Sequence, residues 1–114
     1  LPIIKPYQDK DSYSALHLYP IQIDLNSTKK SRKQVFNELR KKNISVNVHY
    51  IPIYSHPYYE KFDFSNEILP IAENYYNRAI SIPLFSIMTS LQQNTVEQAL
   101  LSIFKLNNKS ETIL

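Results

Sequence analysis

The sequence contains neither glycine nor cysteine among its 114 residues. Without glycine, the chain cannot form the glycine-rich loops that hold phosphate in Walker-type and dinucleotide-binding sites. Without cysteine, it has no disulfide framework and no thiolate metal ligands, which fits a reducing compartment such as the cytoplasm. The sequence starts at Leu1, its one methionine is Met88, and it shows no signal-peptide pattern. We therefore expect a piece of a longer protein.

Long apolar runs are also missing, so we expect no membrane-spanning segment. The length fits a single domain over residues 1–114. The net charge of +3 is small, and the basic residues gather at positions 29–33 and 40–42. We interpret these clusters as the solvated face of a helix, and we expect no nucleic-acid partner.

The first half of the chain alternates strand and helix patterns. Residues 12–24 are rich in β-formers and predict a strand that is interrupted or edged at Pro20. A one-sided surface helix follows, with Ser27 or Thr28 as its N-cap. Asn43 tolerates the left-handed conformation and is expected to end this helix.

Residues 44–50 have the alternation of a strand with one buried face. One side of this strand carries only branched apolar residues, and the other carries short hydrogen-bonding side chains. The apolar set is Ile44, Val46 and Val48, and the polar set is Ser45, Asn47 and His49. Short polar groups suit a crevice, so the polar face is either a site or an ordinary exposed surface.

The second half predicts two helices around a short extended segment. Residues 69–80 form the first helix, with Pro70 in its first turn. Residues 81–85 are extended, and Pro83 restricts them to an edge strand or a non-strand segment. Thr89 and Gln92 form a capping box for a helix over 89–106, and residues 107–114 are expected to fray.

This order predicts an α/β (α+β) two-layer sandwich, in which helices cover one face of a small antiparallel or mixed sheet. Residues 12–24 carry apolar side chains on both faces of their strand. We therefore expect the helix-free face of the sheet to need a partner.

The segment "VHYIPIYSHPYYEKF", residues 48–62, combines two histidines, four tyrosines and two prolines. The prolines give it a stiff path, so it either covers a core or forms one wall of a pocket. His49 and His56 lack the spacing of a zinc site, and we expect no metal. Tyr58 and Tyr59 are interpreted as packing rings with solvated hydroxyls.

The motifs "SALHLYPIQID", "VNVHYIPIYSHPYY" and "LPIAENYYNRAISIPLF" resemble, in order and spacing, the C-terminal small domain of the DegT/DnrJ/StrS sugar aminotransferases. Within that family the chain is most similar to PseC-like enzymes, which aminate a UDP-linked 4-keto-6-deoxy amino sugar. The resemblance implies an enzyme that uses pyridoxal phosphate and takes its amino group from an amino acid, commonly glutamate. It also implies a homodimer and a large domain that supplies the Schiff-base lysine, so the fragment alone should be inactive.

The resemblance also implies site residues. His49, Tyr50 and Tyr54 match the family segment that enters the substrate cleft, and His17 matches the histidine of the first strand. We expect these four residues to contact the nucleotide sugar, and we expect no catalytic or cofactor-binding residue in this chain. Structural alternatives remain: His49 as a sheet-edge cap, Tyr50 as a core residue by strand parity, and His56 as a loop cap.

Two other functions remain open. A βαβ nucleic-acid-binding module would need aromatic and basic residues interleaved on its central strands, whereas the basic residues here fall on a helix. A non-catalytic interaction domain would instead use the apolar sheet face to bind another chain.

Overall fold

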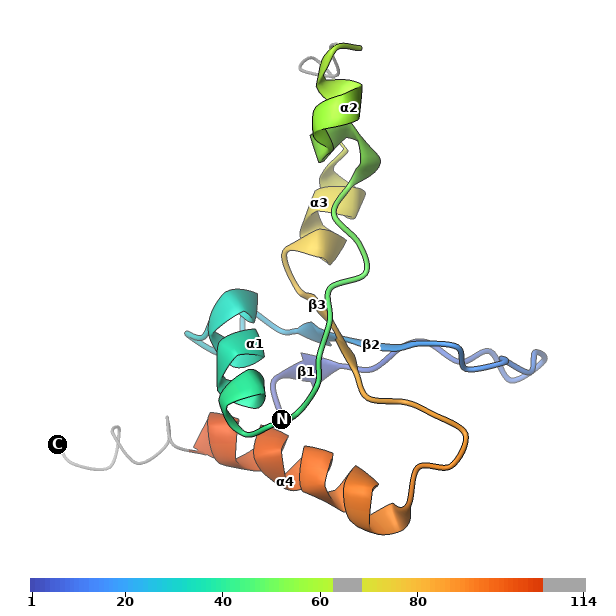
Figure 1. The fold of residues 1–114 in the computed structure, drawn as a ribbon, viewed down its shortest axis with the longest axis vertical. Coiled ribbons are helices and arrows are strands. Elements are labelled where there is room, and N and C mark those ends of the chain that lie inside the picture. Colours follow the sequence, from blue (N-terminus) through green and yellow to red (C-terminus); the bar gives the residue numbers. More distant parts are fainter. Residues whose placement is uncertain (63–68, 106–114) are drawn as a thin grey trace, which may run out of the picture.

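The computed structural model describes residues 1–62 and 69–105, so the predicted fraying of residues 107–114 lies outside the described residues. Its centre is a three-stranded antiparallel sheet in the order β1–β2–β3 (Figure 1). These strands are β1 (Ile3–Ile4), β2 (Tyr19–Ile23) and β3 (Ala79–Ile82). The antiparallel sheet confirms the predicted fold class.

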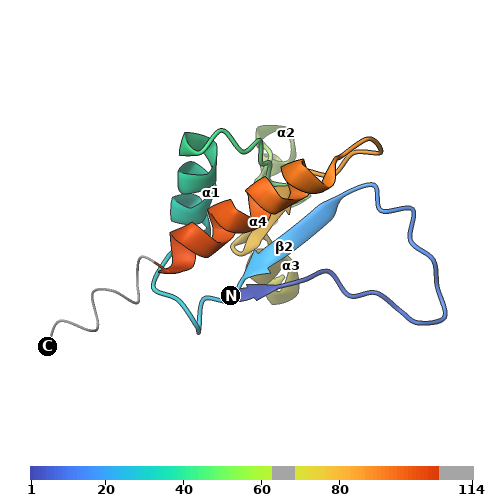
Figure 2. The ribbon, with the colours of Figure 1, turned by 90° about the horizontal axis from the view of Figure 1, so that it is seen from below.

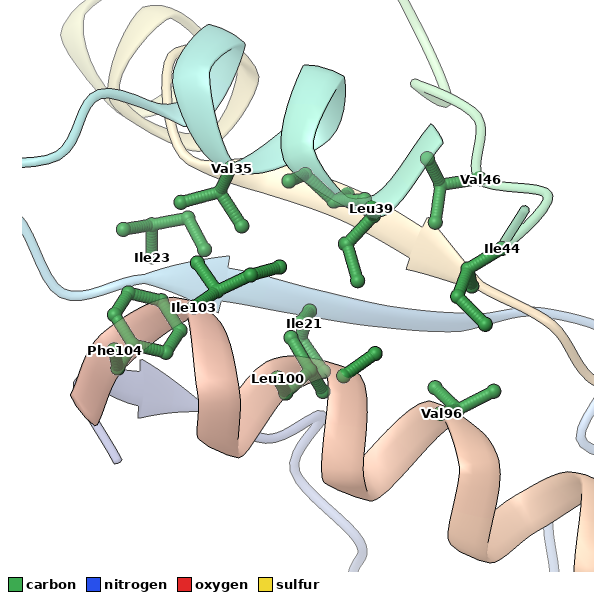
Figure 3. Packing of buried hydrophobic residues seen from close by; sticks show 12 residues of the cluster. Ile21, Ile23, Val35, Leu39, Ile44, Val46, Val96, Leu100, Ile103 and Phe104 are labelled. Atoms are coloured by element: carbon green, nitrogen blue, oxygen red, sulfur yellow. The ribbon is translucent and has the colours of Figure 1, made fainter. Parts of the chain in front are cut away.

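One face of the sheet is buried under α1 (Arg32–Lys41) and α4 (Ser90–Lys105), as Figure 3 shows. Ile21 of β2 pairs with Ile80 of β3, and directly opposed residues of a β-ladder point to the same face. Both are completely buried together with side chains of the two helices. The sheet thus separates a core face from a face that these two helices do not cover.

The helix α4 has the predicted start and the predicted buried stripe. The backbone N–H of Thr89 donates to Oε1 of Gln92 at 2.9 Å, and the N–H of Gln92 donates to Oγ1 of Thr89 at 3.2 Å. This reciprocal pair is the predicted capping box. The apolar residues at helical spacing are all buried: Val96, Ala99, Leu100, Ile103 and Phe104.

The N-cap predicted for α1 was wrong, because Ser31 caps this helix. Its hydroxyl accepts from the N–H of Gln34 at 3.3 Å, and Oε1 of Gln34 accepts from the N–H of Ser31 at 2.7 Å. Ser27 is not available as a cap, since its hydroxyl donates to Asp24 and lowers the pKa of that carboxyl group. Ser27 therefore belongs to a turn that precedes the helix, and the next serine, Ser31, is the N-cap.

Asn43 ends α1 as predicted. Its φ of 60° lies in the left-handed region. The N–H of Asn43 donates to the carbonyl of Arg40, and the N–H of Ile44 donates to the carbonyl of Leu39, each at 3.0 Å. These bonds satisfy carbonyls that the helix end would otherwise leave unpaired.

The predicted strand over residues 12–24 was too long, because only Tyr19–Ile23 pair with neighbouring strands. Leu16 has a φ of 49°, which a strand does not accommodate. Pro20 does not interrupt the strand but lies within it, opposite Ser81. Residues 5–18 form a long connection that extends from the sheet (Figure 2), and β1 was not predicted.

Residues 44–50 also form no regular strand, since only Asn47 bridges to Ser81 of β3. The predicted parity nevertheless holds, because Ile44 and Val46 are buried whereas Ser45 is exposed. The backbone therefore keeps the alternation of a strand without a ladder.

An arm projects away from the sheet in Figure 1, and we define it as residues 50–62 and 69–76. It contains a 3₁₀ turn η1 (Ile53–Ser55), α2 (Pro57–Glu60) and α3 (Pro70–Tyr76). Pro70 opens α3 as predicted, but the helix ends four residues earlier than expected. The chain then turns directly into β3, which ends before Pro83 and is an edge strand of the sheet.

Candidate functional site

His49 lies on the sheet face that α1 and α4 leave uncovered. Asn47 is the bridge partner of Ser81, and His49 shares its parity, so both side chains lie on the side opposite Ile80. The imidazole is half-buried, and its Nδ1 is hydrogen-bonded to Oγ of Ser81 at 2.9 Å. The residue is thus held at the sheet rather than left in bulk solvent.

Tyr50 lies directly beside His49 at the base of the arm. The two rings meet edge to face, with centroids 4.5 Å apart and planes inclined by 65°. Tyr50 is 68% exposed, so the alternative that it is a core residue was wrong. An exposed ring next to a fixed imidazole offers both an apolar surface and a hydroxyl to a ligand.

Tyr54 is placed by η1, and its hydroxyl donates to the carboxylate of Glu73 on α3. This hydrogen bond is the main cause that raises the pKa of Tyr54 to about 12, with desolvation and the negative charge of Glu73 adding to it. The hydrogen bond therefore favours the protonated phenol, which is the form that can donate to Glu73. The bond also ties the two sides of the arm together.

Among the described residues, His17 is not in recorded contact with the other three candidate site residues. It is exposed within the connection 5–18. Among the described residues, no hydrogen bond or ring contact joins it to His49, Tyr50 or Tyr54. The structure thus links His49 with Tyr50, and Tyr54 with Glu73, but leaves His17 separate.

His56 precedes α2, and its backbone carbonyl accepts from the N–H of Tyr59 at 2.9 Å. The side chain makes no capping hydrogen bond. Tyr58 and Tyr59 pack edge to face with ring centroids 5.0 Å apart, and Lys61 lies 4.1 Å from the centroid of Tyr58. The end of the arm is therefore an exposed aromatic cluster.

Sequence reasoning missed two polar residues that hold the candidate site. Ser81 interrupts the apolar run of β3, and Glu73 lies three residues before the end of the tyrosine-rich helix α3. A serine between two isoleucines of a strand is a detectable signal, because a buried hydroxyl requires a hydrogen-bond partner. Its partner could not be identified without the bridge between Asn47 and Ser81.

The described residues do not fit a metal or a pyridoxal phosphate site by themselves. Within residues 1–62 and 69–105, no group of three His, Asp or Glu residues is placed to hold a metal ion. The lysines whose side chains are described are exposed, except Lys30, which pairs with Glu38. With no glycine in the chain, a close backbone cradle for the cofactor phosphate is not provided either.

In the part of the chain that the structure describes, no helix is both long enough and apolar enough to cross a bilayer.

Comparison with known families places the chain among the aminotransferases. The model of the DegT/DnrJ/EryC1/StrS aminotransferase family matches residues 2–101. The chain belongs to this family, as the motif resemblance indicated.

Individual relatives agree with this membership. The spore coat polysaccharide biosynthesis protein SpsC of Bacillus subtilis is 35% identical over 105 residues, covering 90% of this chain and 27% of SpsC. The structure of Helicobacter pylori PseC, an aminotransferase involved in the biosynthesis of pseudoaminic acid, is 32% identical. Its TM-score is 0.60, and the match covers 74% of this chain and 22% of PseC.

A third relative supports the fold over nearly the whole chain. Spr1654 of Streptococcus pneumoniae, described as a sugar aminotransferase in its PMP form, has a TM-score of 0.76 at 23% identity. The match covers 97% of this chain and 28% of Spr1654. The chain thus spans about a quarter of the length of the relatives it matches.

Proposed function

We propose that this chain is the C-terminal small domain of a pyridoxal-phosphate-dependent aminotransferase that acts on a UDP-linked keto sugar. In this proposal the domain closes one side of the substrate cleft, and glutamate is the amino donor. The intact protein works as a cytoplasmic homodimer. The observation that carries the proposal is the family match over residues 2–101 combined with a half-buried His49 that Ser81 holds on the uncovered sheet face.

The cofactor belongs to another part of the intact protein in this proposal. Pyridoxal phosphate supplies the electron sink for amino transfer, and the protein contributes orientation and the exclusion of water. The described residues supply neither a buried lysine nor a phosphate cradle. They do supply hydrogen-bonding and aromatic groups, which are suited to holding a sugar in place.

His49 and Tyr50 are the proposed contacts to the nucleotide sugar. Nδ1 of His49 is used by Ser81, which leaves Nε2 for a sugar hydroxyl or phosphate oxygen. Tyr50 adds an exposed ring beside the imidazole. Tyr54 contributes by its ring or as an acceptor, since its proton is shared with Glu73. His17 is the fourth proposed contact, from the neighbouring connection.

His49→Ala in the intact protein, with its large domain, tests this proposal. Loss of one hydrogen bond to the substrate should weaken the binding of UDP-N-acetylglucosamine about tenfold in isothermal titration calorimetry. His56→Ala is the matched control, because His56 is an exposed histidine of the same segment whose side chain forms no capping bond. Cofactor absorbance should remain unchanged in both variants. Equal affinity of His49→Ala and the unmodified chain would remove His49 from the site.

A further inference from the structure

Ser81 is the only buried polar residue among those that the structure describes, with 6% of its surface exposed. Its neighbours along β3, Ile80 and Ile82, are apolar, and an apolar residue would suit a packed edge strand better. A buried hydroxyl costs free energy unless it is hydrogen-bonded. Here the partner is the Nδ1 atom of His49, 32 residues away in the sequence.

The backbone brings these two residues together through the bridge at Asn47. The N–H of Asn47 donates to the carbonyl of Ser81 at 3.1 Å, and the N–H of Ser81 donates to the carbonyl of Asn47 at 2.8 Å. The hydroxyl of Ser81 then holds the imidazole two residues further on. One strand position therefore fixes both the path of residues 47–49 and the direction of the His49 ring.

We propose that Ser81 is a positioning residue that holds Nδ1 of His49 so that Nε2 is presented to the nucleotide sugar. This inference rests on the proposed function, because it assumes that His49 contacts the substrate. Among the described residues, none forms a hydrogen bond with Nε2. A hydroxyl both donates and accepts, so it holds Nδ1 in the neutral ring and in the imidazolium. The orientation of the ring is therefore independent of its protonation state.

A double-mutant cycle in the intact protein tests the inference, with UDP-N-acetylglucosamine as the probe and calorimetric Kd as the readout. Ser81→Ala should weaken binding about three- to tenfold in the presence of His49 and leave it unchanged in the His49→Ala background. Ser81→Thr, which keeps the hydroxyl, should bind within about twofold of the unmodified chain. Ser45→Ala is the control, because Ser45 is exposed and close to His49 in the sequence.

A second readout is independent of ligand binding. The ¹⁵N chemical shifts of the imidazole report which nitrogen is hydrogen-bonded, and the His49→Ala spectrum identifies the His49 signals. We expect the Nδ1 signal to move in Ser81→Ala and to stay in place in Ser81→Thr and Ser45→Ala. An unchanged Nδ1 signal in Ser81→Ala would overturn the inference. If Ser81→Ala does not fold, Ser81→Cys replaces it in the cycle, since its thiol is a poor substitute for the hydroxyl.

The outcomes separate the inference from the proposed function. Equal weakening by Ser81→Ala in both backgrounds would assign Ser81 a general structural role and overturn the inference. Full affinity of Ser81→Ala, with weakened binding in His49→Ala, would overturn the inference alone. Full affinity of His49→Ala, or no binding of the probe to the unmodified intact protein, would overturn the proposed function and the inference with it.

Discussion

Replacing Ile103 by alanine should strongly destabilise the domain, because its side chain lies at the centre of the core. Ile103 of α4 is 0% exposed and packs among Ile23 of β2 and Val35 of α1 (Figure 3). The substitution removes three carbon atoms, and about 0.8 kcal/mol for each gives roughly 2.4 kcal/mol of lost transfer free energy. The residual cavity raises the total loss in the free energy of unfolding to about 3–4 kcal/mol.

Urea denaturation followed by far-UV circular dichroism measures this loss. The midpoint should fall while the m-value stays constant, because the surface exposed on unfolding is nearly unchanged. Ile87→Ala removes the same atoms from a side chain that is 83% exposed, and it should change the free energy of unfolding by less than about 0.5 kcal/mol. A loss below about 1 kcal/mol for Ile103→Ala, or equal losses for both variants, would refute the packing described for α4.

Two further predictions concern helix capping and titration. Ser31→Ala should lower the free energy of unfolding by about 1 kcal/mol, because it removes the N-cap of α1. Ser27→Ala should lower it less, and urea denaturation midpoints measure both losses. A larger loss for Ser27→Ala would assign the cap to Ser27. In a difference titration at 295 nm against Tyr54→Phe, Tyr54 should ionise with a pKa of about 12 and return toward 10 in Glu73→Gln. Because the folded-state pKa is raised, this contact contributes stability below pH 10 that is lost as the pH rises from 10 to 12. A Tyr54 pKa near 10 in the unmodified chain would contradict the bond to Glu73.

Features that depend on a few neighbouring residues were predicted well. The Thr89 capping box, the apolar stripe of α4 and the left-handed end of α1 at Asn43 each arise within one or two turns of chain. The parity of residues 44–47 was also correct, because alternation follows from an extended backbone whether or not a full ladder forms. Local chemistry is visible in the sequence and is sufficient for these elements.

Features that depend on tertiary pairing were predicted less well. The β-propensity of residues 12–24 could not show that only Tyr19–Ile23 pair with neighbouring strands, because the length of β2 is set by its pairing with β1 and β3. Tyr50 has core parity but is exposed, since this segment bridges to the sheet only at Asn47. The N-cap of α1 is a local exception, because the hydroxyl of Ser27 is bonded to Asp24 and Ser31 caps the helix instead.

The candidate site illustrates the same division between local and distant information. Its aromatic and imidazole groups are adjacent in the sequence, whereas the residues that orient them are 32 and 19 positions away. Those distant partners also distinguish the candidates chemically. Ser81 is hydrogen-bonded to Nδ1 of His49 and leaves Nε2 for a ligand, whereas Tyr54 already donates its hydroxyl proton to Glu73 and can only accept a further hydrogen bond. Either residue can therefore accept from a hydroxyl group, but only His49 can also donate, which favours His49 over Tyr54 as the proposed contact to a phosphate oxygen.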